Sequence, residues 1–204
     1  MNSVLAHRRV AVVALTVAVG VVVTVVAVAA TRGSQPRAFD RPQKAADALP
    51  AAAIRFLHPG ESRRVAEFTT SAGAARAVFV NRSSDNSQIC VWDTDVATGE
   101  QSGGCNPATD AFAGHALTMS LAYDGGPALT AVRDARIVGL VADAVASVEV
   151  AYSDGTARRT LITKDRAFAA VVPTWLLRKG VGPVAVIARD KAGAVLDRQA
   201  TGIG

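Results

Sequence analysis

The two cysteines are the residues whose type and spacing most directly permit chemistry. Cys90 lies in an apolar run, and Cys105 follows two glycines. We expect them to form one disulfide, because an even number of cysteines in an exported domain is usually paired. Closing a loop of this size would stabilise the fold by about 3 kcal/mol on the chain-entropy model. The alternative interpretation is a nucleophilic cysteine assisted by His58 or His115.

The remaining polar residues match no complete catalytic or metal-binding motif. Asp93 and Asp95 have the spacing that begins a calcium loop, but the third ligand position is Ala97, so solvated turn acids are expected. The sequence lacks G-x-S-x-G, H-E-x-x-H and a phosphate-binding glycine loop. We therefore expect neither an enzyme nor a bound metal or cofactor. The alternative is an envelope hydrolase in which His115 works with Asp110 or Asp124.

Composition excludes several classes of protein. The chain has 204 residues, of which 50% are hydrophobic, and a formal net charge of +5. This hydrophobic share excludes a wholly disordered chain. The basic residues are spread along the sequence, and Arg63-Arg64 and Arg158-Arg159 are isolated pairs. A nucleic-acid-binding domain would concentrate its basic residues on one face with aromatic residues between them, so no nucleic acid is expected as a partner.

An apolar segment near the N-terminus determines the predicted location. Residues 10–30 contain no charged residue, and as a helix these 21 residues would span roughly 31 Å, the thickness of a bilayer core. We predict an uncleaved transmembrane helix. The alternative is a cleaved signal peptide, since Ala27-Val28-Ala29 has the small-x-small form of a cleavage site.

The segments on either side of this helix suggest a single-pass membrane protein. Residues 1–9 are expected to form a short cytoplasmic head, and residues 31–60 a tether that includes a short helix over 50–57. Residues 61–204 are expected to form a domain outside the cytoplasm, because long domains cross the membrane largely regardless of charge.

Residues from 62 onward alternate between apolar and polar positions with a period of two, as in half-buried strands. Ser153-Asp154-Gly155-Thr156 is the clearest hairpin turn. A turn of helix is expected at 173–177, with Trp175 covering one end of the core. The fold predicted is mostly β, an antiparallel β-sandwich or barrel-like domain. The predicted strands are residues 62–69, 75–81, 87–94, 116–123, 128–133, 135–141, 146–153 and 156–163, with a final hairpin over 184–200.

Residues 138–150, the turn at 153–156 and residues 166–170 resemble a recurrent pattern in uncharacterised, signal-anchored exported β-domain proteins of GC-rich bacteria. In that pattern a "GLVPDGVASV" segment precedes an aspartyl-glycine hairpin and an "N-x-F-A" strand. This chain has Ala142 in place of the proline, Ala144 in place of the glycine and Arg166 in place of the asparagine. The resemblance covers roughly residues 60–172 and implies a fold, with no activity and no catalytic residue.

These observations predict a membrane-anchored β domain outside the cytoplasm that acts as a binding or structural module. The expected partners are the membrane, through the helix, and an envelope protein or polymer. Neither the ligand nor the oligomeric state follows from the sequence.

Overall fold

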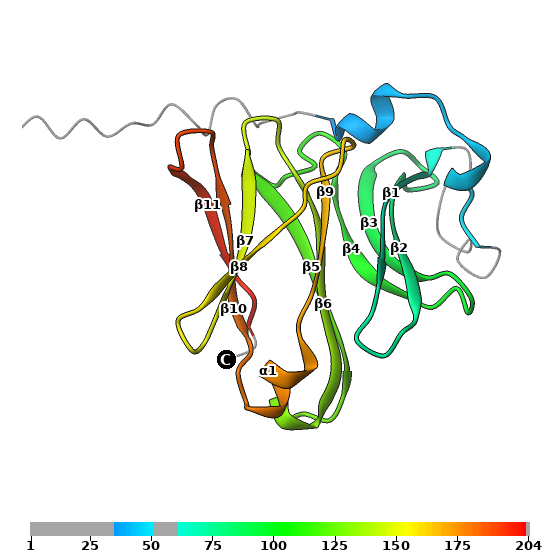
Figure 1. The fold of residues 1–204 in the computed structure, drawn as a ribbon. Helices are drawn as coiled ribbons and strands as arrows, with labels where there is room; N and C mark the ends of the chain where they lie inside the picture. Colours follow the sequence, from blue (N-terminus) through cyan, green and yellow to red (C-terminus); the bar gives the residue numbers. More distant parts are fainter. Residues whose placement is uncertain (1–34, 51–60, 203–204) are drawn as a thin grey trace, which may run out of the picture.

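The computed structural model describes residues 35–50 and 61–202, which form three antiparallel sheets (Figure 1). The first sheet has the strand order β1-β2-β3-β4, the middle sheet β5-β6-β9 and the last sheet β11-β10-β7-β8. The predicted antiparallel, mostly β fold is confirmed. The strands are β1 (Arg63–Thr69), β2 (Ala75–Arg82), β3 (Gln88–Asp95), β4 (Gln101–Pro107), β5 (Leu117–Gly125), β6 (Val132–Val141), β7 (Ser147–Tyr152), β8 (Ala157–Thr160), β9 (Ala167–Val171), β10 (Pro183–Arg189) and β11 (Val195–Ala200).

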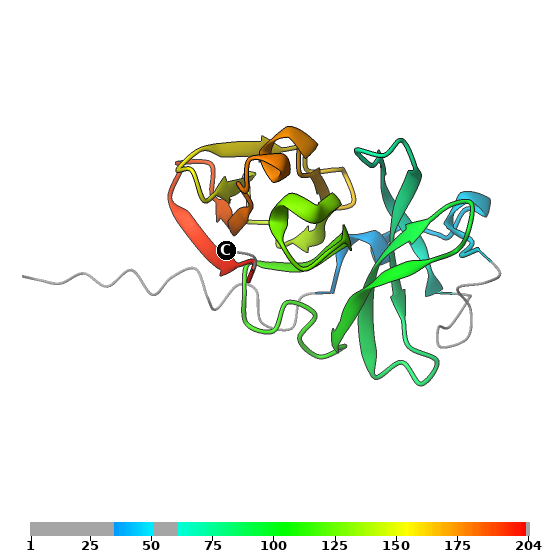
Figure 2. The same ribbon diagram turned by 90° about the horizontal axis from the view of Figure 1, so that it is seen from below.

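Strand β6 is the centre of the molecule because both of its faces are buried. Ile137 and Val141 point into the core shared with the last sheet, whereas Val138 and Leu140 point into the core shared with the first sheet. The middle sheet therefore lies between the other two (Figures 1 and 2). Gly139 is required in this strand, because a Cβ there would lie 2.1 Å from Thr118 O and 2.7 Å from a Phe168 ring carbon.

Several predicted element boundaries are wrong. Residues 128–133 and 135–141 do not form two strands: a 3-10 helix, η5 (Leu129–Ala131), leads into the single strand β6. Strand β4 was not predicted, because its glycines hide any alternation. Strand β9 was not among the strands predicted from alternation and was implied only by the resemblance over residues 166–170. The helical turn is present as α1 (Thr174–Arg178), but Trp175 does not cover the core. Leu176 and Leu177 occupy that position, and both are fully buried.

The predicted disulfide is confirmed and joins β3 to β4. Cys90 and Cys105 are directly opposite each other in the antiparallel register, with their Cα atoms 4.0 Å apart. Cys90 and Trp92 lie on the face of the first sheet that is turned away from the middle sheet, where Trp92 packs against Phe79 and Leu49. The bond therefore fixes the glycine-containing edge strand β4 to the rest of the sheet.

A buried group of charges joins the first sheet to the middle sheet. Asp93 on β3 accepts hydrogen bonds from Arg76 Nε at 2.6 Å and from Arg136 Nε on β6. Arg136 also donates to Asp134 at 2.8 Å and to Asp124 at 3.0 Å. Each cation is thus matched by carboxylates, as charges removed from water require.

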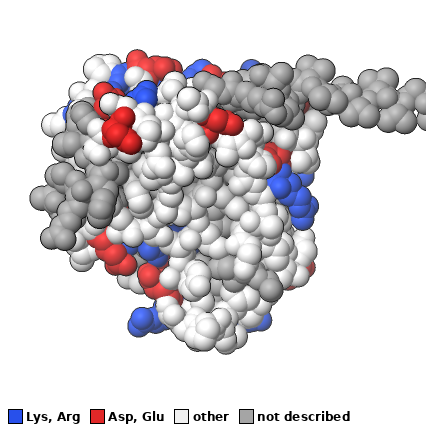
Figure 3. Space-filling model, turned by 180° about the vertical axis from the view of Figure 1, so that it is seen from behind, with Lys and Arg blue, Asp and Glu red and all other residues white. Residues whose placement is uncertain are grey.

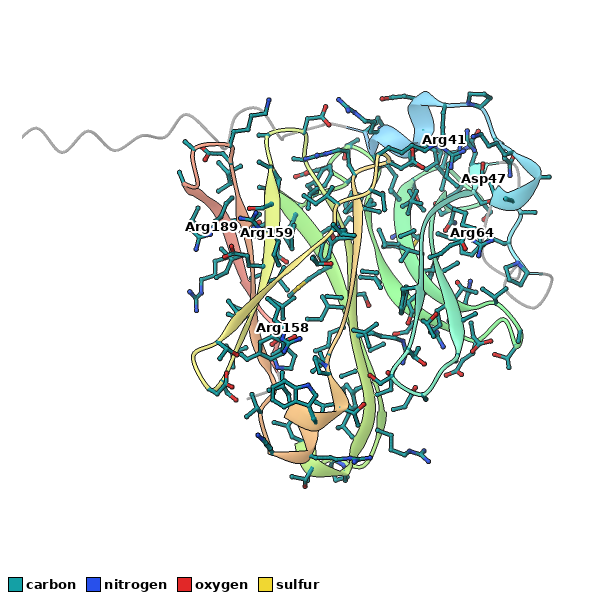
Figure 4. The ribbon with its side chains drawn as sticks, in the orientation of Figure 1. Arg41, Asp47, Arg64, Arg158, Arg159 and Arg189 are labelled. Atoms are coloured by element: carbon teal, nitrogen blue, oxygen red, sulfur yellow. A yellow bond between two sulfur atoms is a disulfide. The ribbon has the colours of Figure 1, made fainter. Side chains whose placement is uncertain are left out.

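Residues 35–50, most of which were expected to belong to a tether, lie against the folded domain. They contain two 3-10 helices, η1 (Arg37–Asp40) and η2 (Ala45–Asp47). Arg41 forms ion pairs with Asp47 at 2.6 Å and with Asp165 at 3.2 Å, and the Asp47 carboxylate accepts a hydrogen bond from Arg64 N at 2.8 Å (Figure 4). We call residues 35–50 the docked segment. Only Pro36, Ala38, Asp47 and Leu49 of this segment are buried, so its ion pairs and these few contacts offset the low apolar content that favoured a tether.

No helix within residues 35–50 or 61–202 has the length and apolar character needed to cross a membrane. The predicted transmembrane helix over 10–30 lies outside the described residues, as do residues 51–57 of the predicted short helix.

Candidate functional site

A tryptophan is exposed where the helix α1 turns its apolar side inward. Pro173 precedes the helix, a position that suits its fixed φ, and Leu176 and Leu177 are buried in the core between the middle and last sheets. Since residues on one helical turn point in different directions, Trp175 and Arg178 are left on the outside. Trp175 is 50% exposed, which is unusual for so large an aromatic side chain.

Two basic side chains rest on the Trp175 ring. Arg158 reaches it from β8, with its Cζ 5.4 Å from the ring centroid, and Lys179, which follows α1, has its Nζ at 5.3 Å. Figure 4 labels Arg158 beside β8, the strand at one edge of the last sheet. Cation–π attraction holds both charges at the ring, so fewer side-chain conformations are lost when they bind a ligand.

A cavity of about 480 Å³ adjoins the same tryptophan. Its basic residues are Arg133, from the start of β6, and Arg178, from α1. The other lining residues are Ser71, Thr130, Ala131, Val132, Thr174 and Trp175, so the walls come from the β1–β2 turn, the η5–β6 segment and α1. We call Arg133, Arg158, Arg178, Lys179 and Trp175 the basic surface.

The β1–β2 turn is held in place by the buried charges described above. Ser71 N donates to Asp134 Oδ1 at 3.0 Å, and Ser71 Oγ donates to Val172 O at 3.2 Å. Asp134 is also bound to Arg136. One wall of the cavity is therefore connected directly to the junction between the first and middle sheets.

None of the four cations of the basic surface has a carboxylate of the described residues within 4.0 Å. Asp154, in the β7–β8 turn near Arg158, is bound to Thr156, whose hydroxyl and backbone N–H hold the pKa of Asp154 below its ordinary value. On the face shown in Figure 3, the centre is largely uncharged and the acidic and basic side chains lie mainly toward its margin. The basic surface can thus bind an anion without first breaking an ion pair.

A second cavity, of about 280 Å³, lies between the docked segment, β1 and the β8–β9 loop. Its charges largely pair with each other: Arg41 with Asp47 and Asp165, and Arg64 with Glu67 at 3.2 Å. Burial alone would raise the pKa of Asp47, but the Arg41 guanidinium and two backbone N–H groups hold that pKa well below its usual range. These ion pairs attach the docked segment to the folded domain. They leave fewer unpaired charges for a ligand than the basic surface offers.

The residues named for a catalytic role do not meet. His115 Nδ1 lies 3.4 Å from Asp197, whereas Asp124 is bound to Arg136. Within the described part of the chain, Asp110 forms no ion pair with the His115 ring. Cys90 is in the disulfide, so it has no thiol to act as a nucleophile. His58 lies outside the described residues.

The two aspartates considered as calcium ligands have different partners in the structure. Asp93 is buried between two arginines, and Asp95 accepts hydrogen bonds from Ala97 N and Thr98 N in its turn. Within the described part of the chain, no three His, Cys, Asp or Glu side chains form a group able to hold a metal ion.

Sequence reasoning missed the basic surface. Arg158-Arg159 looked like an isolated pair, and Arg133 is 25 residues away from Arg158 in the chain. The one available signal was Trp175 followed closely by Arg178 and Lys179. Strand pairing between β7 and β8 and the packing of α1 against β6 bring these residues together.

Comparison of the chain with protein-family models, with curated proteins and with solved structures finds no match. The resemblance of residues 60–172 to exported β-domain proteins therefore stays an expectation from the sequence.

Proposed function

We propose that this protein is a membrane-anchored binding module that holds an anionic component of the cell envelope on its basic surface. The observation that carries the proposal is a group of four cations that form no ion pair with any carboxylate of residues 35–50 and 61–202, and that lie beside an exposed tryptophan and a cavity. Anions bind most readily where cations are already positioned and need not leave another partner.

An oxidising compartment is supported by the disulfide. Cys90 and Cys105 are bonded, and such bonds persist outside the reducing cytoplasm. Together with the apolar segment at 10–30, this favours a domain held on the outer side of the cell membrane.

The docked segment supports a defined orientation of this domain. Gln35 is attached to the surface by hydrogen bonds to Ala108 O at 3.1 Å and from Arg82 at 2.8 Å. If the predicted helix ends at residue 30, the five steps to Gln35 can span at most about 18 Å. In Figure 1 the docked segment lies at the upper end and α1 at the lower end, so the basic surface would point away from the anchoring membrane.

The hydrolase alternative has less support. His115 does not line either of the two cavities described above, and its acidic neighbour Asp197 is occupied by the backbone N–H groups of Ala116 and Leu117. A hydrolase needs its acid or base beside a space for the substrate. Binding is therefore the function that the geometry supports best.

The test uses the full chain in phosphatidylcholine nanodiscs, applied to columns of dextran sulfate and of neutral dextran. We expect retention on dextran sulfate only. A variant in which Arg133, Arg158, Arg178 and Lys179 are changed to Gln should elute early.

The matched control changes four other cations to Gln, namely Arg159, Lys164, Lys191 and Arg198, and has the same net charge. It should be retained almost as well as the parent chain. Equal loss in both variants would show that total charge, rather than the basic surface, causes retention, and the proposal would be wrong.

A further inference from the structure

We infer that the basic surface binds a linear polymer that carries repeated phosphate groups, with one phosphate in the cavity and a following one at the Trp175 rim. This inference rests on the proposed function and adds the ligand class to it. It depends on the division of the four cations into two pairs that share Trp175.

The first pair, Arg133 and Arg178, lines the cavity and comes from two different elements. Thr130 and Thr174 also line the cavity and carry hydroxyl groups, whereas Ser71 Oγ already donates to Val172 O. Donors that approach from several directions suit the tetrahedral oxygens of phosphate better than the two coplanar oxygens of a carboxylate. The cavity is therefore best matched to a phosphate group.

The second pair, Arg158 and Lys179, lies on the Trp175 ring at 5.4 and 5.3 Å from its centroid. Trp175 also lines the cavity, so this one side chain adjoins both pairs. A single small anion would satisfy one pair only. A chain with an anionic group in each repeat can satisfy both, and the second contact then benefits from the high local concentration created by the first.

The same arrangement argues against an anionic bilayer as the ligand. A tryptophan that inserts into lipid needs a free apolar ring, but two charged side chains rest on Trp175. The docked segment, which leads to the predicted membrane helix, lies at the other end of the domain (Figure 1). A polymer beyond the membrane surface fits both facts.

The experiment measures tryptophan fluorescence of the full chain in phosphatidylcholine nanodiscs. The chain has two tryptophans, and Trp175→Phe leaves Trp92 as the internal control. The probes are orthophosphate, linear polyphosphate, polygalacturonate and vesicles of phosphatidylglycerol with phosphatidylcholine. We expect polyphosphate to bind at least tenfold more tightly, per phosphate, than orthophosphate, and more tightly than polygalacturonate or the vesicles.

Two neighbouring substitutions on β8 test the rim. Arg158→Gln should weaken polyphosphate binding about threefold to tenfold and reduce the slope of log K against log salt by about 1, while orthophosphate binding stays unchanged. Arg159→Gln removes the same charge one residue along the strand and should leave both unchanged. Arg178→Gln should weaken both probes, because it removes a cation from the cavity.

The outcomes separate the inference from the proposed function. If no phosphate or carboxylate probe binds, the proposed function itself is wrong. If polyphosphate binds no better per phosphate than orthophosphate, or if Arg158→Gln and Arg159→Gln behave alike, anion binding stands and the two-part site is wrong. Tighter binding of polygalacturonate or of the vesicles would replace the phosphate polymer with that ligand.

Discussion

The buried carboxylate of Asp93 offers the most sensitive test of how the first and middle sheets are joined. The substitution Asp93→Asn keeps the side chain's shape but removes its negative charge. Asp93 is 1% exposed and accepts hydrogen bonds from two arginine Nε groups, of Arg76 and Arg136, that are themselves buried. After the substitution both cations would remain in a dry interface with one fewer anion.

The expected cost can be worked out from the partners that remain. Arg136 keeps Asp134 at 2.8 Å and Asp124 at 3.0 Å, whereas Arg76 keeps only Asp95 at 3.7 Å and two backbone carbonyls at 3.3 Å. Arg76 is thus the cation left poorly compensated. Breaking a buried pair on one side costs about 3–5 kcal/mol, which is a large part of the 5–15 kcal/mol that stabilises an ordinary domain.

The assay is urea unfolding of the oxidised full chain in detergent, with Trp175→Phe in every sample so that the fluorescence comes from Trp92, which lies in the first sheet next to Asp93. The control is Asp143→Asn. The Asp143 side chain is 66% exposed and forms ion pairs with Arg37 at 3.2 Å and Arg166 at 3.7 Å, so its loss should cost less than about 1 kcal/mol. If Asp93→Asn is no more destabilising than this control, the view that the buried charges hold the two sheets together is refuted.

Three further perturbations have defined outcomes. Gly103→Ala should destabilise the fold by about 2 kcal/mol or more in urea unfolding, because its Cβ would lie 2.1 Å from a carbonyl oxygen and 2.8 Å from the Trp92 ring. Reducing the β3–β4 disulfide, whose cysteines are 15 positions apart, should lower the free energy of unfolding by about 3 kcal/mol. Asp47→Asn should make the docked segment more sensitive to protease at pH 7. The lowered pKa of Asp47 means that its carboxylate stabilises the fold above about pH 4 and loses this effect as the pH falls further, so the parent chain should approach the variant only in strong acid.

Each of these outcomes has a matched comparison. Gly104→Ala, where a new Cβ meets no atom within 4 Å, should be nearly neutral, and equal losses at both glycines would contradict the argument from close approach. If the free energy of unfolding does not change on reduction, β4 is held by its backbone hydrogen bonds to β3 alone. A parent chain whose protease sensitivity does not rise below pH 4 would show that Asp47 does not anchor the docked segment.

Much of the fold could be predicted because it depends on local patterns. In β7 the side chains of Val148, Val150 and Tyr152 are buried while their neighbours are partly exposed, which is the period-two pattern in the sequence. The turn at Asp154-Gly155 could be predicted because it contains a glycine. Gly155 has a φ of 83°, a conformation that only glycine adopts easily. The disulfide followed from there being two cysteines and from the expectation of export.

Other features depend on which elements meet in space. Strand β6 is buried on both faces, so it shows no alternation and its length was misjudged. The docked segment looked like a tether because its binding depends on ion pairs such as Arg41 with Asp165, 124 positions apart. Ion pairs between residues so far apart produce no periodic pattern in the sequence, so they could not be predicted from it.

The sequence by itself determined most of the strands, the disulfide partners and the apolar segment at 10–30, because alternation, cysteine number and hydrophobic length can be read from the chain without knowledge of the fold. Only the tertiary structure decided the basic surface, since Arg133, Arg158 and Trp175 come from β6, β8 and α1. Their association results from the burial of Leu176 and Leu177, which turns the tryptophan outward toward cations that the sheets have brought within reach.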